Sequence, residues 1–319
     1  MQLKKILAIL IAALMLFAFG CKKEAEAPAE KPAEAPAPAD GSFTVTDMAG
    51  REVKFEKPVD KAVALTASDC EIIYAIGGEA ALVGRGEYCD YPPEVMAIPS
   101  LTSGAETNIE QIIALEPDTV FLSMMAQTQE QVDQLEKAGI RVVVSDAQDI
   151  EGTFTAIRLI GQVLGKAEEA DQIVADMNAI FDEIKANRYD GTKTIYFEIY
   201  PQWTAGNNTF MNEIADMIGL KNCFDDVEKW AEISEEQVIE RNPDFIVTTT
   251  MYSGEGPSPE EEIMARPGWE NVTAVKNGDV LSLPNDELTR PGPGLAEGAQ
   301  MLFDFVVESL AAQELAPAA

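Results

Sequence analysis

The sequence predicts an α/β protein with two similar lobes, each built on a central, mostly parallel sheet. A single long α-helix joins the lobes, and a ligand cleft lies between them. Three features of the chain predict this fold: a motif that occurs twice, an alternation of strand-like and helix-like segments, and an uninterrupted helical segment between the motif copies. Alternating elements form parallel sheets with helices on both faces, and ligands bind at the carboxyl ends of such strands.

The repeated motif is E-Q-[IV]-I-x-x-x-P-D-x-[IV], and it occupies residues 110–120 and 236–246. Each copy reads as a short amphipathic helix, a Pro-Asp break and an apolar strand. The helix ends before the proline because the proline ring clashes with a helical residue in front of it. Coincidence is the alternative, since this connection is common. We interpret the identical spacing as a duplication, which predicts two similar lobes.

The first 20 residues read as a lipoprotein signal peptide. Lys4 and Lys5 precede an apolar run that is short for a membrane span but suits a secretory signal. Gly20-Cys21 resembles a lipoprotein cleavage site, so we expect Cys21 to carry the lipid; an ordinary signal peptide with an incidental cysteine is the alternative. Residues 21–41 are rich in Ala, Pro and Glu and predict a disordered tether. We therefore expect an extracytoplasmic protein anchored to a membrane.

Residues 42–166 are expected to form the N-terminal lobe. Glycines, prolines and apolar periods divide this region into strands and helices. The expected segments are a hairpin of strands 43–47 and 51–55, strand 62–65, helix 69–76, strand 81–84, the first motif copy, helix 127–138 and strand 140–144.

Residues 167–188 carry apolar side chains at helical spacing without glycine or proline, which predicts one helix of roughly 30 Å. Because it falls between the motif copies, we expect it to connect the lobes as a stiff hinge; a surface helix of one lobe is the alternative. Residues 189–319 are expected to form the C-terminal lobe. Its segments are strand 194–199, loop 200–206, the second motif copy, strand 280–283, loop 284–294 and helix 295–310.

The composition excludes several functional classes. The 23 basic and 55 acidic residues give a net charge of −32, which disfavours nucleic acid as a partner, although acidity is also typical of solubility or a saline habitat. The absence of histidine excludes Ser-His and Cys-His catalysis and histidine-ligated zinc. We expect no cofactor, no metal and no enzymatic activity, because no nucleophile–base pair or dinucleotide-binding loop is visible. An α/β enzyme and a structural surface lipoprotein are the remote alternatives.

Three cysteines follow Cys21. Cys70 and Cys89 each come after a first-lobe strand, and we expect the two strands to be neighbours. They are candidates for a disulfide, which requires Cα atoms within about 7 Å. Cys223 would then be a buried free thiol.

Several segments resemble the substrate-binding proteins of ABC importers for cobalamin, haem and ferric siderophores. The similarity extends over residues 43–310, and the Y-x-D-Y-P-P pattern is closest to the cobalamin branch. The matching segments are 84–94 (GRGEYCDYPPE), 108–110 with 117–118, 234–236 with 243–244, and 289–294 (TRPGPG). The resemblance implies a protein that captures a bulky chelate between its lobes and delivers it to an ABC permease dimer with ATPase subunits.

The resemblance also implies roles for individual residues. Glu110 and Glu236, one on each lobe, would pair with permease arginines; the alternative is that both are solvated helix-start residues favoured by the helix dipole. Arg290 would meet a polar ligand substituent or neutralise nearby acidic residues. The implied cleft residues are Tyr88, Tyr91, Leu101, Met124, Trp203 and Arg290.

A cobalamin-like corrinoid is the expected ligand, with a ferric hydroxamate siderophore or haem as alternatives. A flat macrocycle would stack on Tyr91 and Trp203. The acidic chain disfavours a trianionic ferric catecholate. Two features depart from the family pattern. Gly294 stands where a second arginine is frequent, and Leu101 and Met124 stand where cobalamin binders tend to carry tryptophan.

Overall fold

The first lobe is built on a five-stranded parallel sheet in the order β5-β4-β3-β6-β7. The computed structural model describes residues 41–189, 191–250 and 256–315, so the predicted signal peptide, Cys21 and nearly all of the tether lie outside the described part. Strands β3 and β6 are buried along their whole length, as expected for a sheet covered on both faces. The strands are β3 (Ala62–Ala64), β4 (Leu82–Gly86), β5 (Ser100–Leu101), β6 (Thr119–Leu122) and β7 (Arg141–Val144).

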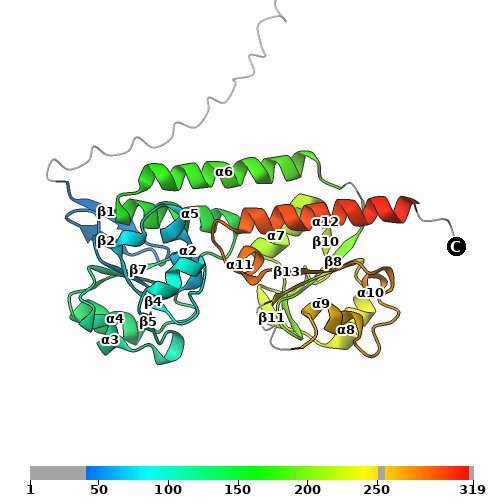
Figure 1. Ribbon diagram of the computed structural model, residues 1–319, viewed down its shortest axis with the longest axis horizontal. Helices are drawn as coiled ribbons and strands as arrows, with labels where there is room; N and C mark the ends of the chain where they lie inside the picture. Colours follow the sequence, from blue (N-terminus) through cyan, green and yellow to red (C-terminus); the bar gives the residue numbers. More distant parts are fainter. Residues whose placement is uncertain (1–40, 190, 251–255, 316–319) are drawn as a thin grey trace, which may run out of the picture. The chain divides into compact units, whose positions relative to one another are not determined.

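Four helices and an antiparallel hairpin surround this sheet (Figure 1). Short polar side chains begin the helices: Thr66, Asn108, Thr128 and Asp149 each accept a hydrogen bond from a backbone N–H of the first turn. The hairpin is β1 (Phe43–Thr46) with β2 (Glu52–Phe55), and the helices are α2 (Ala67–Ala75), α3 (Ile109–Ala114), α4 (Gln129–Lys137) and α5 (Ile150–Leu164), with 3-10 turns at Glu79–Ala81, Pro93–Ala97 and Gly104–Glu106.

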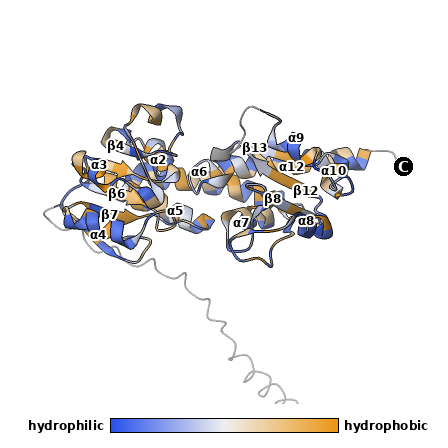
Figure 2. Ribbon diagram, turned by 90° about the horizontal axis from the view of Figure 1, so that it is seen from below, coloured by the Kyte–Doolittle hydropathy of each residue, from blue (hydrophilic) through white to orange (hydrophobic). Residues whose placement is uncertain are grey.

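The second lobe has a four-stranded parallel sheet in the order β10-β8-β12-β13. A separate two-stranded antiparallel sheet, β9 with β11, lies beyond the carboxyl end of β8. The elements are β8 (Thr194–Glu198), β9 (Trp203–Ala205), α7 (Phe210–Ile218), β10 (Lys221–Asn222), β11 (Trp230–Glu232), α8 (Glu235–Arg241), β12 (Phe245–Thr249), α9 (Pro259–Met264), α10 (Thr273–Asn277), β13 (Val280–Leu283) and α11 (Asn285–Thr289). Figure 2 shows hydrophobic residues in strands of both sheets, whereas hydrophilic and hydrophobic residues alternate along the helices.

The two motif copies have the same structure, which confirms the predicted duplication of architecture. α3 leads into β6 and α8 leads into β12, each strand being central in its sheet. The residues before the prolines, Glu116 and Asn242, have nearly identical backbone angles, φ of 48° and 47°. Asp118 and Asp244 accept the backbone N–H at the start of β3 (3.1 Å) and of β8 (2.9 Å). Each Pro-Asp break therefore ends a helix and ties the following strand to its neighbour.

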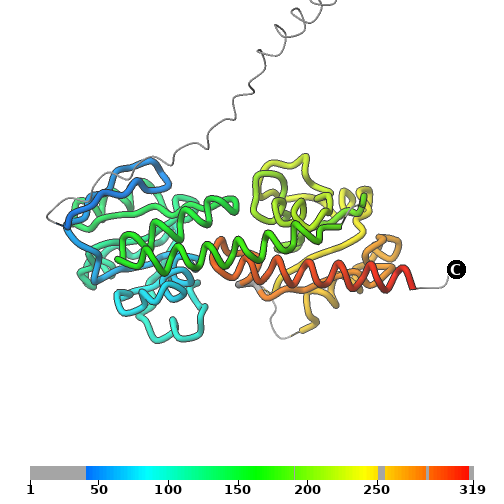
Figure 3. The backbone as a smooth tube through the Cα atoms, turned by 90° about the horizontal axis from the view of Figure 1, so that it is seen from above, coloured from blue at the N-terminus to red at the C-terminus, as the bar shows by residue number. Residues whose placement is uncertain are grey.

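Two long helices lie against each other, and one of them spans both lobes. α6 (Ala167–Ala186) is the predicted connecting helix, and it packs against α5, α7 and the C-terminal helix α12 (Leu295–Leu315). Figure 3 shows α6 and α12 side by side. The sequence did not predict that the last helix lies along the connector. In the described part of the chain, no helix is long and apolar enough to span a bilayer.

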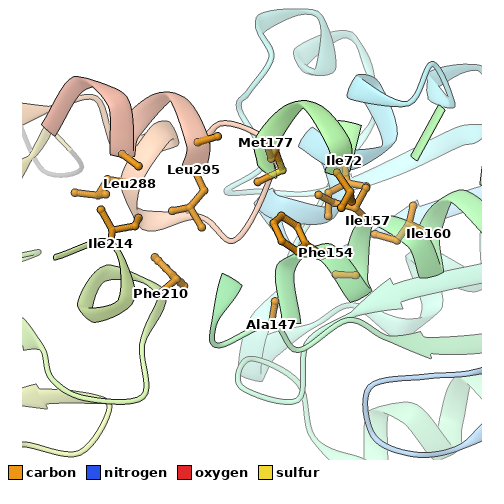
Figure 4. Packing of buried hydrophobic residues seen from close by; sticks show 14 of the residues in the cluster. Ile72, Ala147, Phe154, Ile157, Ile160, Met177, Phe210, Ile214, Leu288 and Leu295 are labelled. Atoms are coloured by element: carbon orange, nitrogen blue, oxygen red, sulfur yellow. The ribbon is translucent and has the colours of Figure 1, made fainter. Parts of the chain in front are cut away.

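The lobes share a continuous hydrophobic cluster. It includes Phe154 of the first lobe, Met177 of α6, and Phe210 and Leu288 of the second lobe (Figure 4). Met177 and Phe154 are 3% and 5% exposed, so the junction between the lobes is packed like a domain interior. Two loops predicted in the second lobe contain short elements: 200–206 includes β9, and 284–294 includes α11. Pairing and packing with distant segments stabilise these elements, and local periodicity did not reveal them.

Candidate functional site

A cavity of about 550 Å³ lies between the lobes at the carboxyl ends of β3, β6, β7 and β8. This is the position that the topology predicts for a ligand, because the loops that follow parallel strands converge there. The volume is in the range of small-molecule sites. Its lining residues are Thr66, Ser68, Ser123, Met125, Ala126, Ser145, Asp146, Ala147, Gln148, Ile199, Tyr200, Trp203, Phe210, Trp230, Thr289 and Pro291.

The second lobe contributes an aromatic wall to the cavity, formed by Tyr200, Trp203, Phe210 and Trp230. In the β9–β11 pair, Trp230 lies opposite Ala205, two residues from Trp203, so both tryptophans project from the same face of this small sheet. Phe210 supports Trp230 with ring centroids 5.2 Å apart. Trp203 remains 40% exposed and Tyr200 50% exposed, which leaves ring area available for a ligand.

The first lobe contributes a polar wall, formed by Thr66, Ser68, Ser123, Ser145 and Asp146. A backbone hydrogen bond fixes Asp146, whose Oδ2 accepts from Met124 N at 3.1 Å. Behind this wall lies Asp69, which is fully buried and accepts a hydrogen bond of 2.7 Å from the Ser145 hydroxyl. Burial raises the pKa of Asp69 to about 7, because a carboxylate without solvent is disfavoured.

The third wall is the C-terminal strap, residues 289–294, which crosses from the second lobe to the first. Thr289 and Pro291 line the cavity. Next to them, Arg290 Nη2 contacts Asp90 Oδ1 at 2.6 Å, and Gly294 N donates to Glu71 Oε1 at 2.6 Å. These contacts connect residues 200 and 223 positions apart in the chain. The strap therefore holds the cavity wall against the first lobe.

The structure brings one of the six expected cleft residues, Trp203, to the cavity lining. Leu101 is 4% exposed and packs with Met124 in the first-lobe hydrophobic cluster, where both fill space behind the sheet. Tyr88 is 72% exposed and Tyr91 half-buried, and both lie outside the lining. Arg290 is buried against Asp90, so of its two expected roles the structure shows the contact with an acidic residue.

Several lining residues were not anticipated from the sequence. Asp146 is the second residue after the predicted strand 140–144, and the rule that ligands bind at strand ends would have found it. Met125 takes the place expected for Met124. Trp230 reaches the cavity only because β11 pairs with β9 from 25 residues downstream, a long-range contact that no local pattern signals.

Glu110 and Glu236 occupy equivalent positions outside the cavity. Each is the second residue after the N-cap of its helix, α3 or α8, and each is exposed. The two carboxylates are therefore available to a partner.

Cys70 and Cys89 are buried, and the structure describes both as thiols. They follow the adjacent strands β3 and β4, and each Sγ lies within hydrogen-bonding distance of Ala64 O, at 3.8 and 3.9 Å. Cys223 is also a thiol, and burial raises its pKa to about 12. The predicted disulfide between the first two cysteines stays a prediction.

The fold and the inter-lobe cavity define a two-lobed substrate-binding protein. A model of the family described as periplasmic binding protein matches residues 63–287, and the chain belongs to this family. An uncharacterized ABC transporter substrate-binding lipoprotein, YvrC of Bacillus subtilis, is 32% identical over 309 residues, covering 94% of this chain and 95% of the relative.

Two further relatives extend this comparison. A vitamin B12-binding protein of Pectobacterium carotovorum is 26% identical over 76% of this chain and 86% of its own length. A crystal structure of a possible iron-binding (periplasmic solute-binding) protein from Staphylococcus epidermidis superposes with a TM-score of 0.64 at 29% identity, covering 78% of this chain and 99% of that one.

Proposed function

We propose that this protein is an extracytoplasmic lipoprotein that captures a cobalamin-like corrinoid in the inter-lobe cavity and delivers it to an ABC importer. The observation that carries this proposal is the aromatic wall at the strand ends, where Trp203 and Trp230 share one face of a small sheet. A corrinoid is flat, largely apolar over its faces and edged with carboxamides. Stacking on aromatic rings with few polar anchors suits such a ligand. The vitamin B12-binding relatives point in the same direction.

The charge of the lining supports a neutral or cationic ligand. No described residue that lines the cavity is cationic, and Asp146 is anionic. A haem would bring carboxylates into this cavity and find no cationic partner in the described lining, so we favour a corrinoid over haem. A ferric hydroxamate chelate is the second candidate, because such chelates are neutral or cationic and the Staphylococcus epidermidis relative is described as possibly iron-binding.

Calorimetry of the full mature chain with cyanocobalamin, cobinamide, ferrichrome and haem tests the ligand. We expect the two corrinoids to bind and to quench tryptophan fluorescence. Trp203→Leu should weaken corrinoid binding about fivefold, since an aromatic contact contributes roughly 1 kcal/mol beyond its area. Met301→Ala, on α12 and outside the cavity lining, is the control and should bind like the wild type. Tight binding of ferrichrome without corrinoid binding would replace the corrinoid by a hydroxamate chelate.

We further propose that Glu110 and Glu236 dock the protein on its permease. Equivalent exposed carboxylates, one on each lobe, match a two-fold partner that presents arginines. Glu110→Ala with Glu236→Ala should abolish transport and leave corrinoid affinity unchanged. The matched control is Glu130→Ala with Glu260→Ala, since both are exposed at the same position in the first turns of α4 and α9. Normal transport by the first pair would make the repeated motif purely architectural.

A further inference from the structure

Most of the hydroxyl and carboxyl groups in the described cavity lining come from the first lobe, and the second lobe adds those of Tyr200 and Thr289. The hydroxyl groups of Thr66, Ser123 and Ser145 and the carboxylate of Asp146 come from the segments that directly follow β3, β6 and β7, and that of Ser68 comes from the first turn of α2, whereas the rings come from the second lobe. Within the described lining, Asp146 is the only side chain that carries a charge. A ligand seated on the rings therefore presents its edge to hydroxyls and one carboxylate.

Asp146 has acceptor capacity to spare. Its Oδ2 takes the N–H of Met124, while Oδ1 is buried and has no hydrogen-bond partner among the described residues. A buried acceptor left without a donor costs about 1–3 kcal/mol, and more when it is charged. Because Asp146 lines the cavity, rotation of its carboxyl group would bring this acceptor to a hydrogen-bond donor of the ligand and remove that cost.

Asp69 fixes the orientation of the Ser145 hydroxyl so that this group, too, can act only as an acceptor toward the cavity. The Ser145 hydroxyl donates its hydrogen to Asp69 Oδ1 at 2.7 Å, so it has only acceptor capacity left for the cavity. Asp69 itself is 0% exposed, and its Oδ2 has no partner in the described part of the chain. The buried carboxyl group of Asp69, the half-buried carboxylate of Asp146 and the inward-directed hydroxyl thus give one wall an excess of acceptors.

We propose that Ser145 and Asp146, backed by Asp69, form an acceptor wall that selects ligands by their hydrogen-bond donors. On the proposed function, the wall recognises peripheral carboxamide N–H groups of a corrinoid and rejects corrinoids that carry carboxylates at the same positions. It would accept an ammonium group for the same reason. A site built to receive N–H donors discriminates strongly against analogues without them, because its acceptors are then left unpaired. Repulsion from Asp146 adds to that discrimination against a carboxylate.

The test compares cobinamide with its derivatives in which one side-chain carboxamide is hydrolysed to a carboxylate. The wild-type protein should bind cobinamide at least about tenfold more tightly than it binds the derivative whose carboxylate lies at the acceptor wall. Asp146→Asn keeps the volume and an acceptor for Met124 N but removes the charge. The ratio of the affinity for cobinamide to the affinity for the carboxylate derivative should therefore fall to about twofold, mainly because the variant binds the carboxylate derivative more tightly. Asp149→Asn is the matched control: Asp149 is exposed, lies outside the lining and caps α5, a role that asparagine also fills. It should keep the wild-type ratio.

A second arm uses a cationic ferric trihydroxamate with a free ammonium group and its neutral N-acetylated form. The wild type should prefer the ammonium form about tenfold, and Asp146→Asn should lose the preference. If corrinoids or hydroxamates bind, but the affinity ratio within each ligand pair is the same in the wild type and in Asp146→Asn, the proposal of an acceptor wall is refuted and the capture function stands. If only hydroxamates bind and the ammonium preference depends on Asp146, the wall stands and the corrinoid assignment falls. Binding of neither class overturns both.

Discussion

The contact between Glu71 and the C-terminal strap offers a quantitative test of how the cavity wall is held. Glu71 lies on α2 in the first lobe, is 4% exposed, and accepts the N–H of Gly294 at 2.6 Å. Gly292 lies against the same carboxylate, since a Cβ at that position would be 2.7 Å from Oε2 and 2.8 Å from Cδ. Glu71→Ala therefore removes the hydrogen bond, and Gly292→Ala displaces the carboxylate that makes it.

The two substitutions should be strongly non-additive. A hydrogen bond to a charged group contributes about 1.5–3 kcal/mol, so Glu71→Ala should lower the free energy of unfolding by roughly 2 kcal/mol. Gly292→Ala should cost about 1–2 kcal/mol in the wild type, because the buried carboxylate must move away from Gly294. In the Glu71→Ala background it should cost close to nothing, since the atoms that it would meet are absent. The expected coupling is about 1–2 kcal/mol.

Urea unfolding of the four proteins of this double-mutant cycle measures the coupling. Glu71→Gln is the control, because its amide oxygen can still accept from Gly294 N, and it should cost less than Glu71→Ala. Glu71→Ala and Gly292→Ala should both also weaken ligand binding, since they loosen the strap whose residues Thr289 and Pro291 line the cavity. Additive costs within about 0.5 kcal/mol would show that Gly292 and Glu71 do not act through one contact, and would refute the reasoning.

Three further predictions concern protonation, anchoring and cysteine oxidation. Burial raises the pKa of Asp69 from 3.8 to about 7 in the folded protein, because the buried carboxyl group is favoured in its protonated form. Its contribution to the free energy of unfolding is therefore fully present below pH 3.8 and is lost as the pH rises through 7. Asp69→Asn should consequently gain stability relative to the wild type between pH 4 and pH 8, by on the order of 3–4 kcal/mol in urea titrations, and an unchanged difference would contradict the burial argument. Cys21→Ser should release the protein from the membrane fraction, because stable attachment needs lipid chains; membrane retention of a cleaved mutant chain would exclude this anchor. Thiol titration of the unfolded, non-reduced mature chain lacking Cys21 should find one thiol, that of Cys223, if Cys70 and Cys89 are bridged outside the cytosol, whereas three thiols rule the bridge out.

Local patterns in the sequence were sufficient for part of the regular elements. The strand 280–283 was predicted at its observed bounds, and the connecting helix differs only at its C-terminal end, Ala186 instead of 188. Both segments have strong periodicity and clear breakers at their ends. Helices α5, α7, α9 and α10 were not predicted, although Asp149 and Thr209 are standard N-cap residues that signal two of them.

The site was less accessible to sequence reasoning than the fold. Trp203 was expected in the cleft from resemblance, and it lines the cavity. Leu101 and Met124 were expected in the cleft from resemblance, yet both pack against the first sheet. The direction in which a side chain points from a loop depends on the packing of its neighbours, and the resemblance carried no information about that packing.

The sequence by itself determined the α/β class, the two lobes, the helical connector and the strand-end location of the cavity, because hydrophobic periods, proline breaks and a duplicated motif act over neighbouring residues. Only the tertiary structure decided which residues face one another across that cavity. Trp230 joins Trp203 through a strand pair, Asp69 lies behind Ser145 at a separation of 76 positions, and Glu71 holds Gly294 across 223. Such contacts form between segments that are brought together by folding, and their identity depends on the packing of the whole chain.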